Sequence, residues 1–258
     1  LDNHQFASYE LAFCEAEISA ANSFLDYAEQ AEPQSVEHSL SIVFAGETFK
    51  SVIGRLRSIT VDAQLGIENI AALESSNDAK SLLTFCNGAM LGILGSKIAL
   101  DEIVRLPSRL NEEKELVRET FYRFANDVVA PLAEEIHRQD KDIPEEIIRP
   151  AAELGCFGTC IPERFGGLQP DDKPDSLGMI VVTEELSRGS LGAAGSLITR
   201  PEIAARALLA GGTEAQQQKW LPALANGELL CAISITEPNT GSDVAAVALK
   251  ATATEGGW

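Results

Sequence analysis

Apolar residues recur every three or four positions through most of the chain up to about residue 226, and this period is typical of α-helices. Before residue 108 the pattern marks four segments, 6–27, 36–65, 67–73 and 82–100. They predict a helical bundle with a continuous apolar seam. In the second segment the seam residues are Leu40, Val43, Phe44, Phe49, Ile53 and Leu56. No pattern of catalytic residue types occurs here, so we interpret this region as a packing or oligomerisation extension.

Residues 108–226 continue the helical period. An apolar stripe runs from Val117 to Ile136, and Pro131 should bend that helix because proline lacks an amide N–H and clashes with the preceding turn. Thr213 and Gln216 have the spacing of a capping box, which predicts a helix start. Further helices are predicted over 144–154, 177–187 and 197–209.

The helix predicted over 177–187 has an apolar and a polar face. We expect its apolar residues to face inward and its two glutamates to face solvent. The inward residues are Ile180, Val181 and Leu186, and the glutamates are Glu184 and Glu185. The small residues 189–195 that follow should let two helices, or a helix and a ligand, approach closely.

After Gly227 the period changes from helical to alternating. Residues 229–236 and 247–254 are predicted as strands of an antiparallel β domain, and the chain stops at Trp258 in what reads as a hairpin. The predicted fold is mainly α, with a helical extension (1–107), an all-helical domain (108–226) and the first strands of a β domain (227–258). We expect this chain to be part of a longer protein.

Composition narrows the range of partners. A net charge of −19 argues against nucleic acid or an anionic membrane as the main partner. The apolar run 82–100 is interrupted by Asn87, Ser96 and Lys97, so we expect no membrane span. Five cysteines without a C-x-x-C pair and three histidines predict neither a metal site nor a disulfide framework. A reducing, cytoplasmic location follows.

The polar loop after the first predicted strand carries candidate chemistry. Pro238 fixes its own φ, and Gly241 lets a ligand approach the backbone closely. The hydroxyls of Thr236, Thr240 and Ser242, with free N–H groups beside them, suit a phosphate or the polar rim of a flat heterocycle. The alternative is a plain polar turn after a strand.

Four stretches together resemble one family. Residues 235–243, Ile-Thr-Glu-Pro-Asn-Thr-Gly-Ser-Asp, resemble the signature of the FAD-dependent acyl-CoA dehydrogenase family. The helix at 212–228, the Glu-Glu-Leu-Ser-Arg-Gly run at 184–189 and the loop at 161–167 resemble the same family in order and spacing. Because the four motifs are collinear over about 112–258, the resemblance is specific.

The resemblance implies a flavoenzyme. Family members bind FAD and take the α-proton of an acyl-CoA with a glutamate base, while the β-hydride passes to flavin N5. Their electrons usually leave to electron-transferring flavoprotein, and most are homo-oligomers, either dimers or tetramers. Because the base lies in a C-terminal helical domain of the family, the resemblance implies no catalytic residue in this chain.

Site residues carried over by the resemblance cluster in the loop. Ile235 and Thr236 would lie against the flavin ring, and Gly241 and Ser242 would approach the FAD pyrophosphate or the acyl-CoA. Ile233 would share the substrate-facing side of the strand, where many relatives carry an aromatic residue. Glu237 is interpreted as a structural carboxylate of the loop and not as the base.

The extension before residue 108, together with residues 195–203, resembles the methylsuccinyl-CoA dehydrogenase branch. Many relatives lack a cation at the position of Arg200, which could pair with a substrate carboxylate. This would favour a short branched or dicarboxylic acyl-CoA. The alternative is a salt bridge between Arg200 and a glutamate.

Two other functions stay open. The chain could belong to a non-catalytic scaffold member of the family, with the extension serving assembly. It could also belong to a flavin-dependent oxidase or monooxygenase relative.

Overall fold

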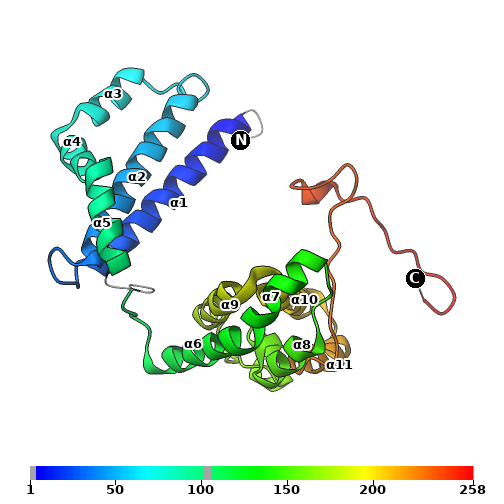
Figure 1. Cartoon of the computed structure of the whole chain (residues 1–258). Helices are drawn as coiled ribbons and strands as arrows, with labels where there is room; N and C mark the ends of the chain where they lie inside the picture. The colour runs from blue at the N-terminus through cyan, green and yellow to red at the C-terminus, as the bar shows by residue number, and fades with distance from the viewer. Residues whose placement is uncertain (1–3, 101–105, 258) are drawn as a thin grey trace. The chain divides into compact units, whose positions relative to one another are not determined.

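The computed structural model describes residues 4–100 and 106–257. The chain divides into two compact units, Leu1–Ser108 and Arg109–Trp258, which are described separately (Figure 1). Both are built from helices, which confirms the predicted mainly helical fold class. The three-part division at residues 107 and 226 stays a prediction.

The first unit is built on two long neighbouring helices, α1 (Gln5–Ala28) and α2 (Val36–Ser58) (Figure 1). The buried residues of α1 are all small and lie seven positions apart: Ala7, Cys14, Ala21 and Ala28. This spacing places them on one stripe of the helix, where small side chains allow close contact with α2. Of the seam residues predicted on α2, Ile53 is buried, while Phe44 is 37% exposed.

Three shorter helices complete this unit: α3 (Ile67–Ser75), α4 (Asn77–Thr84) and α5 (Gly88–Leu100). The segment predicted as one helix over 82–100 is therefore two helices with a break at residues 85–87. Ser76 starts α4 earlier than predicted, because its side chain accepts a hydrogen bond from the Ala79 N–H. Asn87 caps α5 by accepting from the Met90 N–H.

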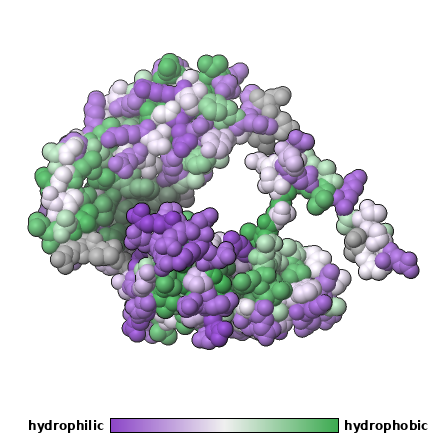
Figure 2. Space-filling model, turned by 45° about the vertical axis from the view of Figure 1, so that its right-hand side comes forward, coloured by the Kyte–Doolittle hydropathy of each residue, from purple (hydrophilic) through white to green (hydrophobic). Residues whose placement is uncertain are grey.

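Helix α5 is apolar but has no buried residue, and Ile93 is 64% exposed. Hydrophobic residues are accordingly visible on the surface of the first unit (Figure 2). In the described ranges no single helix is long and apolar enough to cross a membrane. Helices α4 and α5 together reach the length and apolar composition of a membrane span, but they are bent by 45° at their junction.

The second unit begins with a long helix that changes its winding. It consists of α6 (Glu112–Phe124), a π-helical turn η2 (Ala125–Val129) and α7 (Ala130–Gln139). Asn111 caps α6 by accepting from the Lys114 N–H, so the helix starts at Glu112. The bend expected from Pro131 takes the form of this wider turn. The turn, residues 125–129, lies just before Pro131. In a regular α-helix the ring of Pro131 would clash with the carbonyl of residue 127, and the wider π-helical turn avoids this clash.

A loop with short 3₁₀ turns connects α8 (Glu145–Glu153) to the next helix. Gly155 adopts φ +75° directly after α8, a conformation that ends a helix. The loop folds back on itself through hydrogen bonds from the Gln169 N–H to the Ile161 carbonyl and from the Glu163 N–H to the Gln169 carbonyl. Gly167 packs directly against the Ile161 backbone within this loop.

The remaining helices are α9 (Ser176–Ser190), the π-helical turn η5 (Leu191–Gly195), α10 (Ser196–Gly211) and α11 (Glu214–Ala225). The predicted capping box of Thr213 and Gln216 is confirmed at the start of α11. The small-residue tract works as expected, because a Cβ on Gly189 would lie 3.1 Å from the Ala125 Cβ on the neighbouring helix. Backbones can approach this closely only where side chains are minimal.

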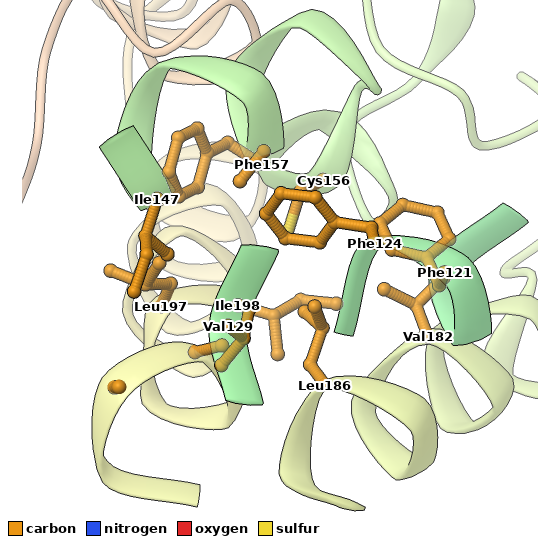
Figure 3. Close-up of a cluster of buried hydrophobic side chains, with 13 residues drawn as sticks. Phe121, Phe124, Val129, Ile147, Cys156, Phe157, Val182, Leu186, Leu197 and Ile198 are labelled. Atoms are coloured by element: carbon orange, nitrogen blue, oxygen red, sulfur yellow. The ribbon is translucent and has the colours of Figure 1, made fainter. Parts of the chain in front are cut away.

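Helices α6, α8, α9 and α10 share one apolar core, which Figure 3 shows with Phe157 and Cys156 above Ile198 and Leu186. The prediction for α9 was right for Val181 and Leu186 but wrong for Ile180, which is 55% exposed, and for Glu185. Glu185 is only 1% exposed. Its burial is compensated by Arg188, whose Nε donates to the Glu185 carboxylate at 2.8 Å.

Arg188 also ties α9 to the π-helical turn of the first long helix. Its guanidinium donates to Asn126 Oδ1 at 3.0 Å and to the Tyr122 carbonyl at 3.3 Å. It also lies over the Tyr122 ring, 4.1 Å from the centroid. This arginine therefore links Glu185 to the turn that Pro131 imposes.

Residues 229–236 and 247–254, predicted as strands, follow a drawn-out course (Figure 1) but belong to no sheet in the part of the chain that the structure describes. A strand is defined by hydrogen bonds to a neighbour, and in the described residues this region has only the isolated bridges Glu237–Thr240 and Thr254–Gly257. The alternating pattern predicted two strands of a sheet, but the described residues show no hydrogen-bonded pairing between them.

Candidate functional site

The predicted site begins where the chain leaves α11. Gly227 reverses the direction with φ +74°, and a Cβ there would lie 2.8 Å from the Ala152 Cβ and 2.9 Å from the Phe157 ring. The Leu229 N–H then donates to the Ala223 carbonyl at 2.9 Å. These contacts fix the start of the extended segment against the second helical unit.

Residues 230–236 carry backbone groups without partners. Among the residues described, no hydrogen bond uses the N–H or C=O groups of this segment. Ile233 and Ile235 are exposed by 37% and 52%, although both are large and apolar. Unpaired backbone and exposed apolar side chains together make a surface suited to a ligand or a further strand.

Glu237 organises the loop that follows. Its Oε2 accepts from the Ala248 N–H at 3.0 Å, and its Oε1 accepts from the Leu249 N–H at 2.7 Å. Its backbone N–H and C=O bond to the C=O and N–H of Thr240 at 3.0 and 3.1 Å. These bonds confirm the interpretation of Glu237 as a structural carboxylate of the loop, residues 237–249.

The hydroxyl of Thr240 was expected to face a ligand, but it does not. It was grouped with Thr236 and Ser242 on the polar rim of the loop, but Thr240 is only 7% exposed. Its Oγ1 donates to the Ala246 carbonyl at 3.4 Å, so the hydroxyl closes the loop instead of facing a ligand. Thr236 and Ser242 are exposed.

Gly241 and Ser242 have the features expected of a ligand-binding turn. Within residues 4–100 and 106–257, nothing accepts from their two amide N–H groups. A Cβ built on Gly241 would meet no atom within 4 Å, so its backbone is open to a ligand. Backbone donors left free in a turn are typical of sites that bind anionic groups.

Arg200 lies on α10, beside the start of the extended segment. It lines a cavity of about 40 Å³ together with apolar residues of α10 and residues 229–231. Burial raises the pKa of the Cys231 thiol in this cavity, and the charge of Arg200 opposes that rise. No carboxylate in the described ranges forms an ion pair with Arg200, in contrast to Arg206 and Glu202 on the same helix.

The structure brings together only part of the predicted site. Arg200 shares its cavity with Leu229, Leu230 and Cys231. Ile233, Ile235, Thr236, Gly241 and Ser242 follow along the chain and do not line this cavity. The sequence did not predict that Cys231 lies beside Arg200, or that Glu237 binds the amides of Ala248 and Leu249. Cys231 shares one face of the alternating segment with Ile233 and Ile235, and this pattern could have marked it as a site residue.

A larger cavity of about 330 Å³ lies between α6, α9 and the loop before α9, away from these residues. Lys114 Nζ donates to Asp175 Oδ2 at 2.6 Å on its wall, and both side chains are mostly buried. Burial raises the pKa of Asp175, but the hydrogen bonds from Lys114 and from the Gly178 N–H outweigh it and hold the pKa below its usual value. This ion pair joins the N-terminal ends of α6 and α9.

The described residues contain no cluster of three or more histidine, cysteine, aspartate or glutamate side chains that could hold a metal ion. Both carboxylate oxygens of Glu237 are engaged by amides, so this residue is not available as a base. The five cysteines are free thiols, and burial raises the pKa of Cys156 to about 12. The arrangement can therefore bind and orient a ligand, but it offers no acid–base pair.

The helices of the second unit are similar in sequence to those of acyl-CoA dehydrogenases. Residues 111–228 match the family described as acyl-CoA dehydrogenase, N-terminal domain. Over 144 residues the chain is 51% identical to (2S)-methylsuccinyl-CoA dehydrogenase of Cereibacter sphaeroides, covering 56% of this chain and 25% of that protein. Over 138 residues it is 36% identical to glutaryl-CoA dehydrogenase of Desulfococcus multivorans, covering 54% and 35% of the two chains.

Among solved structures, the complex of glutaryl-coenzyme A dehydrogenase with glutaryl-CoA aligns with a TM-score of 0.49 and 34% identity. The alignment covers 55% of this chain and 35% of that one. The chain thus spans about a quarter to a third of the length of the relatives that it matches. The family match ends at residue 228, immediately before the extended segment.

Proposed function

We propose that the chain is part of an FAD-dependent enzyme that α,β-dehydrogenates an acyl-CoA thioester, on the premise that residues 111–228, which match the acyl-CoA dehydrogenase N-terminal domain, are such a domain. The observation that carries the proposal is the position of the unpaired backbone. The unpaired segment 230–236 and the loop 237–249 follow directly after the matched residues. Residues 235–243, which resemble the family signature, lie within them.

The residues present fit a flavin. Ile235 and Thr236 offer unpaired backbone groups and an exposed hydroxyl, which suit the polar edge of the isoalloxazine ring. Gly241 and Ser242 offer free amides to the pyrophosphate or to the acyl-CoA, and the space above Gly241 is open. When bound, FAD supplies the oxidising chemistry by accepting the β-hydride at N5.

In the proposed reaction this chain binds and orients the reactants but does not transfer the proton. The base is a glutamate that the family carries in its C-terminal helical domain, which agrees with the engagement of both Glu237 oxygens by backbone amides. Donors fixed before the ligand arrives act without further reorganisation when charge develops on the bound groups. Electron-transferring flavoprotein is the proposed electron acceptor, and a homo-oligomer the proposed assembly.

A short branched or dicarboxylic acyl-CoA such as methylsuccinyl-CoA is the proposed substrate. The support is the 51% identity to (2S)-methylsuccinyl-CoA dehydrogenase and the position of Arg200, which has no carboxylate partner in the described part of the chain. A cation beside an apolar cavity can pair with the free carboxylate of such a substrate. The free thiols agree with a cytoplasmic location.

The flavin spectrum of the full-length enzyme tests the activity. Flavin absorbance that bleaches on addition of methylsuccinyl-CoA or butyryl-CoA supports dehydrogenation. A protein that lacks a flavin spectrum refutes it. Flavin that bleaches and then recolours rapidly in air without an electron acceptor would favour the oxidase or monooxygenase relative, and flavin that no acyl-CoA reduces would favour a scaffold.

Arg200→Ala tests the substrate class. Removing one partner of a desolvated charge pair costs about 2 to 5 kcal/mol, so kcat/KM for methylsuccinyl-CoA should fall by at least about 30-fold. The value for butyryl-CoA, which has no free carboxylate, should change by less than about threefold. Arg206→Ala is the matched control, because Arg206 lies on the same helix but pairs with Glu202. An equal loss for both substrates would remove Arg200 from substrate recognition.

A further inference from the structure

The loop at residues 237–249 keeps its shape without a sheet. Its first residue, Glu237, holds the Ala248 and Leu249 amides at the far end with one carboxylate oxygen each. The Thr240 hydroxyl bonds to the Ala246 carbonyl across the inside of the loop. Thr240 is buried, although residues 241–250 are all exposed. A single carboxylate therefore closes a loop that has no hydrophobic core of its own.

This closure determines which donors stay available. Between the ends that Glu237 joins, the Ala246 N–H bonds to the Asp243 carbonyl and the Val247 N–H bonds to the Val244 carbonyl. The Gly241 and Ser242 amides, in contrast, have no acceptor anywhere in the described ranges. Intraloop bonds thus occupy the amides of residues 240 and 246–249. The amides of 239 and 241–245, which include those of Gly241 and Ser242, have no acceptor in the described ranges and are left for a ligand.

We propose that Glu237 is a positioning residue, which fixes this loop so that the Gly241 and Ser242 amides are pre-arranged for the phosphate groups of a bound nucleotide cofactor or thioester. This rests on the proposed function for the identity of the ligand. Glu237 acts through the loop backbone and does not touch the reacting atoms. A ligand that meets donors already in place avoids the entropic cost of ordering the loop.

Two substitutions separate geometry from charge. In Glu237→Gln the amide group has one acceptor oxygen and one donor NH₂, so one of the two backbone N–H groups would face a donor. Glu237→Asp keeps the charge but shortens the side chain by one methylene, so it cannot reach both amides. Both variants should open the loop. Glu255→Gln is the control for the charge change, because no hydrogen bond of its carboxylate is found in the described part of the chain.

In the full-length enzyme the positioning role predicts a loss in binding rather than in chemistry. Both Glu237 variants should weaken binding of FAD or raise the KM for acyl-CoA by about tenfold or more, while kcat at saturation with both ligands changes by less than about threefold. Glu255→Gln should match the wild type. A fall in kcat of more than about 100-fold at unchanged KM and FAD affinity would assign Glu237 to the chemistry and overturn the proposal. Unchanged binding in both variants would overturn it as well.

Hydrogen exchange on the full-length protein freed of flavin tests the loop independently of the cofactor. The Ala248 and Leu249 amides should exchange about tenfold or more slowly than the free amides of Gly241 and Ser242, after correction for intrinsic rates. Both Glu237 variants should remove this protection. Fast exchange at Leu249 in the wild type would refute the closed loop even if the enzyme binds FAD. A wild-type enzyme without flavin would refute the proposed function and leave the exchange result to decide the role of Glu237 in the loop.

Discussion

Arg188→Met is expected to destabilise the second unit more than any surface charge change. The substitution keeps an unbranched side chain of similar length but removes the guanidinium. It breaks the 2.8 Å bond to Glu185 and the bonds to Asn126 and to the Tyr122 carbonyl. The connection between α9 and the π-helical turn at residues 125–129 is lost with them.

The expected cost follows from the unequal burial of the two partners. The Glu185 side chain is 2% exposed and the Arg188 side chain 35% exposed. Removing one partner of a buried ion pair costs about 3 to 5 kcal/mol, whereas an exposed pair contributes about 0 to 1 kcal/mol. Because solvent reaches the arginine end, an intermediate loss of about 2 to 3 kcal/mol is expected. For a unit of about 150 residues this lowers Tm by about 4 to 12 °C.

Urea unfolding followed by tryptophan fluorescence measures the effect. Both tryptophans of the chain follow residue 108, and Trp220 lies on α11 of the second unit, so the signal reports that unit. Arg138→Met is the matched control, because Arg138 and Glu134 form an i,i+4 pair with side chains 74% and 78% exposed. It should cost about 0.5 kcal/mol or less.

The double variant Glu185→Gln/Arg188→Met adds a second check. It should recover part of the loss, since the buried side chain that has lost Arg188 is then neutral. Equal midpoints for Arg188→Met and Arg138→Met at unchanged m-values would refute the reasoning, because the burial of Glu185 would then carry no energetic consequence.

Two further outcomes are expected. Gly167→Ala should prevent stable folding of the loop at residues 155–169 and cost more than about 3 kcal/mol, because its Cβ would lie 1.9 Å from the Ile161 carbonyl oxygen. Gly166→Ala next to it has φ +82° but open space, so thermal unfolding should show a loss of only about 1 to 2 kcal/mol, and equal losses would contradict the packing argument. The contribution of the Lys114–Asp175 pair to stability should depend on pH, because the pKa of Asp175 is lower in the folded state than in the unfolded state. The pair stabilises the fold fully above the unfolded pKa of about 4, and this stabilisation is lost as the pH falls through the folded pKa. The difference in unfolding free energy between wild type and Lys114→Met should therefore shrink from pH 6 to pH 2, and a constant difference would argue against the ion pair.

Most of the helices could be predicted from the sequence because their determinants are local. The caps at Ser35, Asn111 and Thr213 each bond to an amide three residues ahead, and apolar periodicity marks the buried face over the same short distance. The prediction of a mainly helical chain and the motifs that resemble acyl-CoA dehydrogenases rest on this local information. It could not reveal the burial of Glu185, because its partner network includes Asn126 and Tyr122, about sixty residues away in sequence.

The same division applies to the candidate site. The sequence by itself determined the extended backbone of residues 229–236, the turn at Pro238 to Gly241 and the residue types that suit a phosphate. Only the tertiary structure decided that Thr240 turns inward, that Glu237 closes the loop through Ala248 and Leu249, and that Arg200 lies beside Cys231. Side-chain periodicity encodes which face of an element is apolar. The partner of a polar group depends on where the chain returns in space, and no local pattern specifies that return.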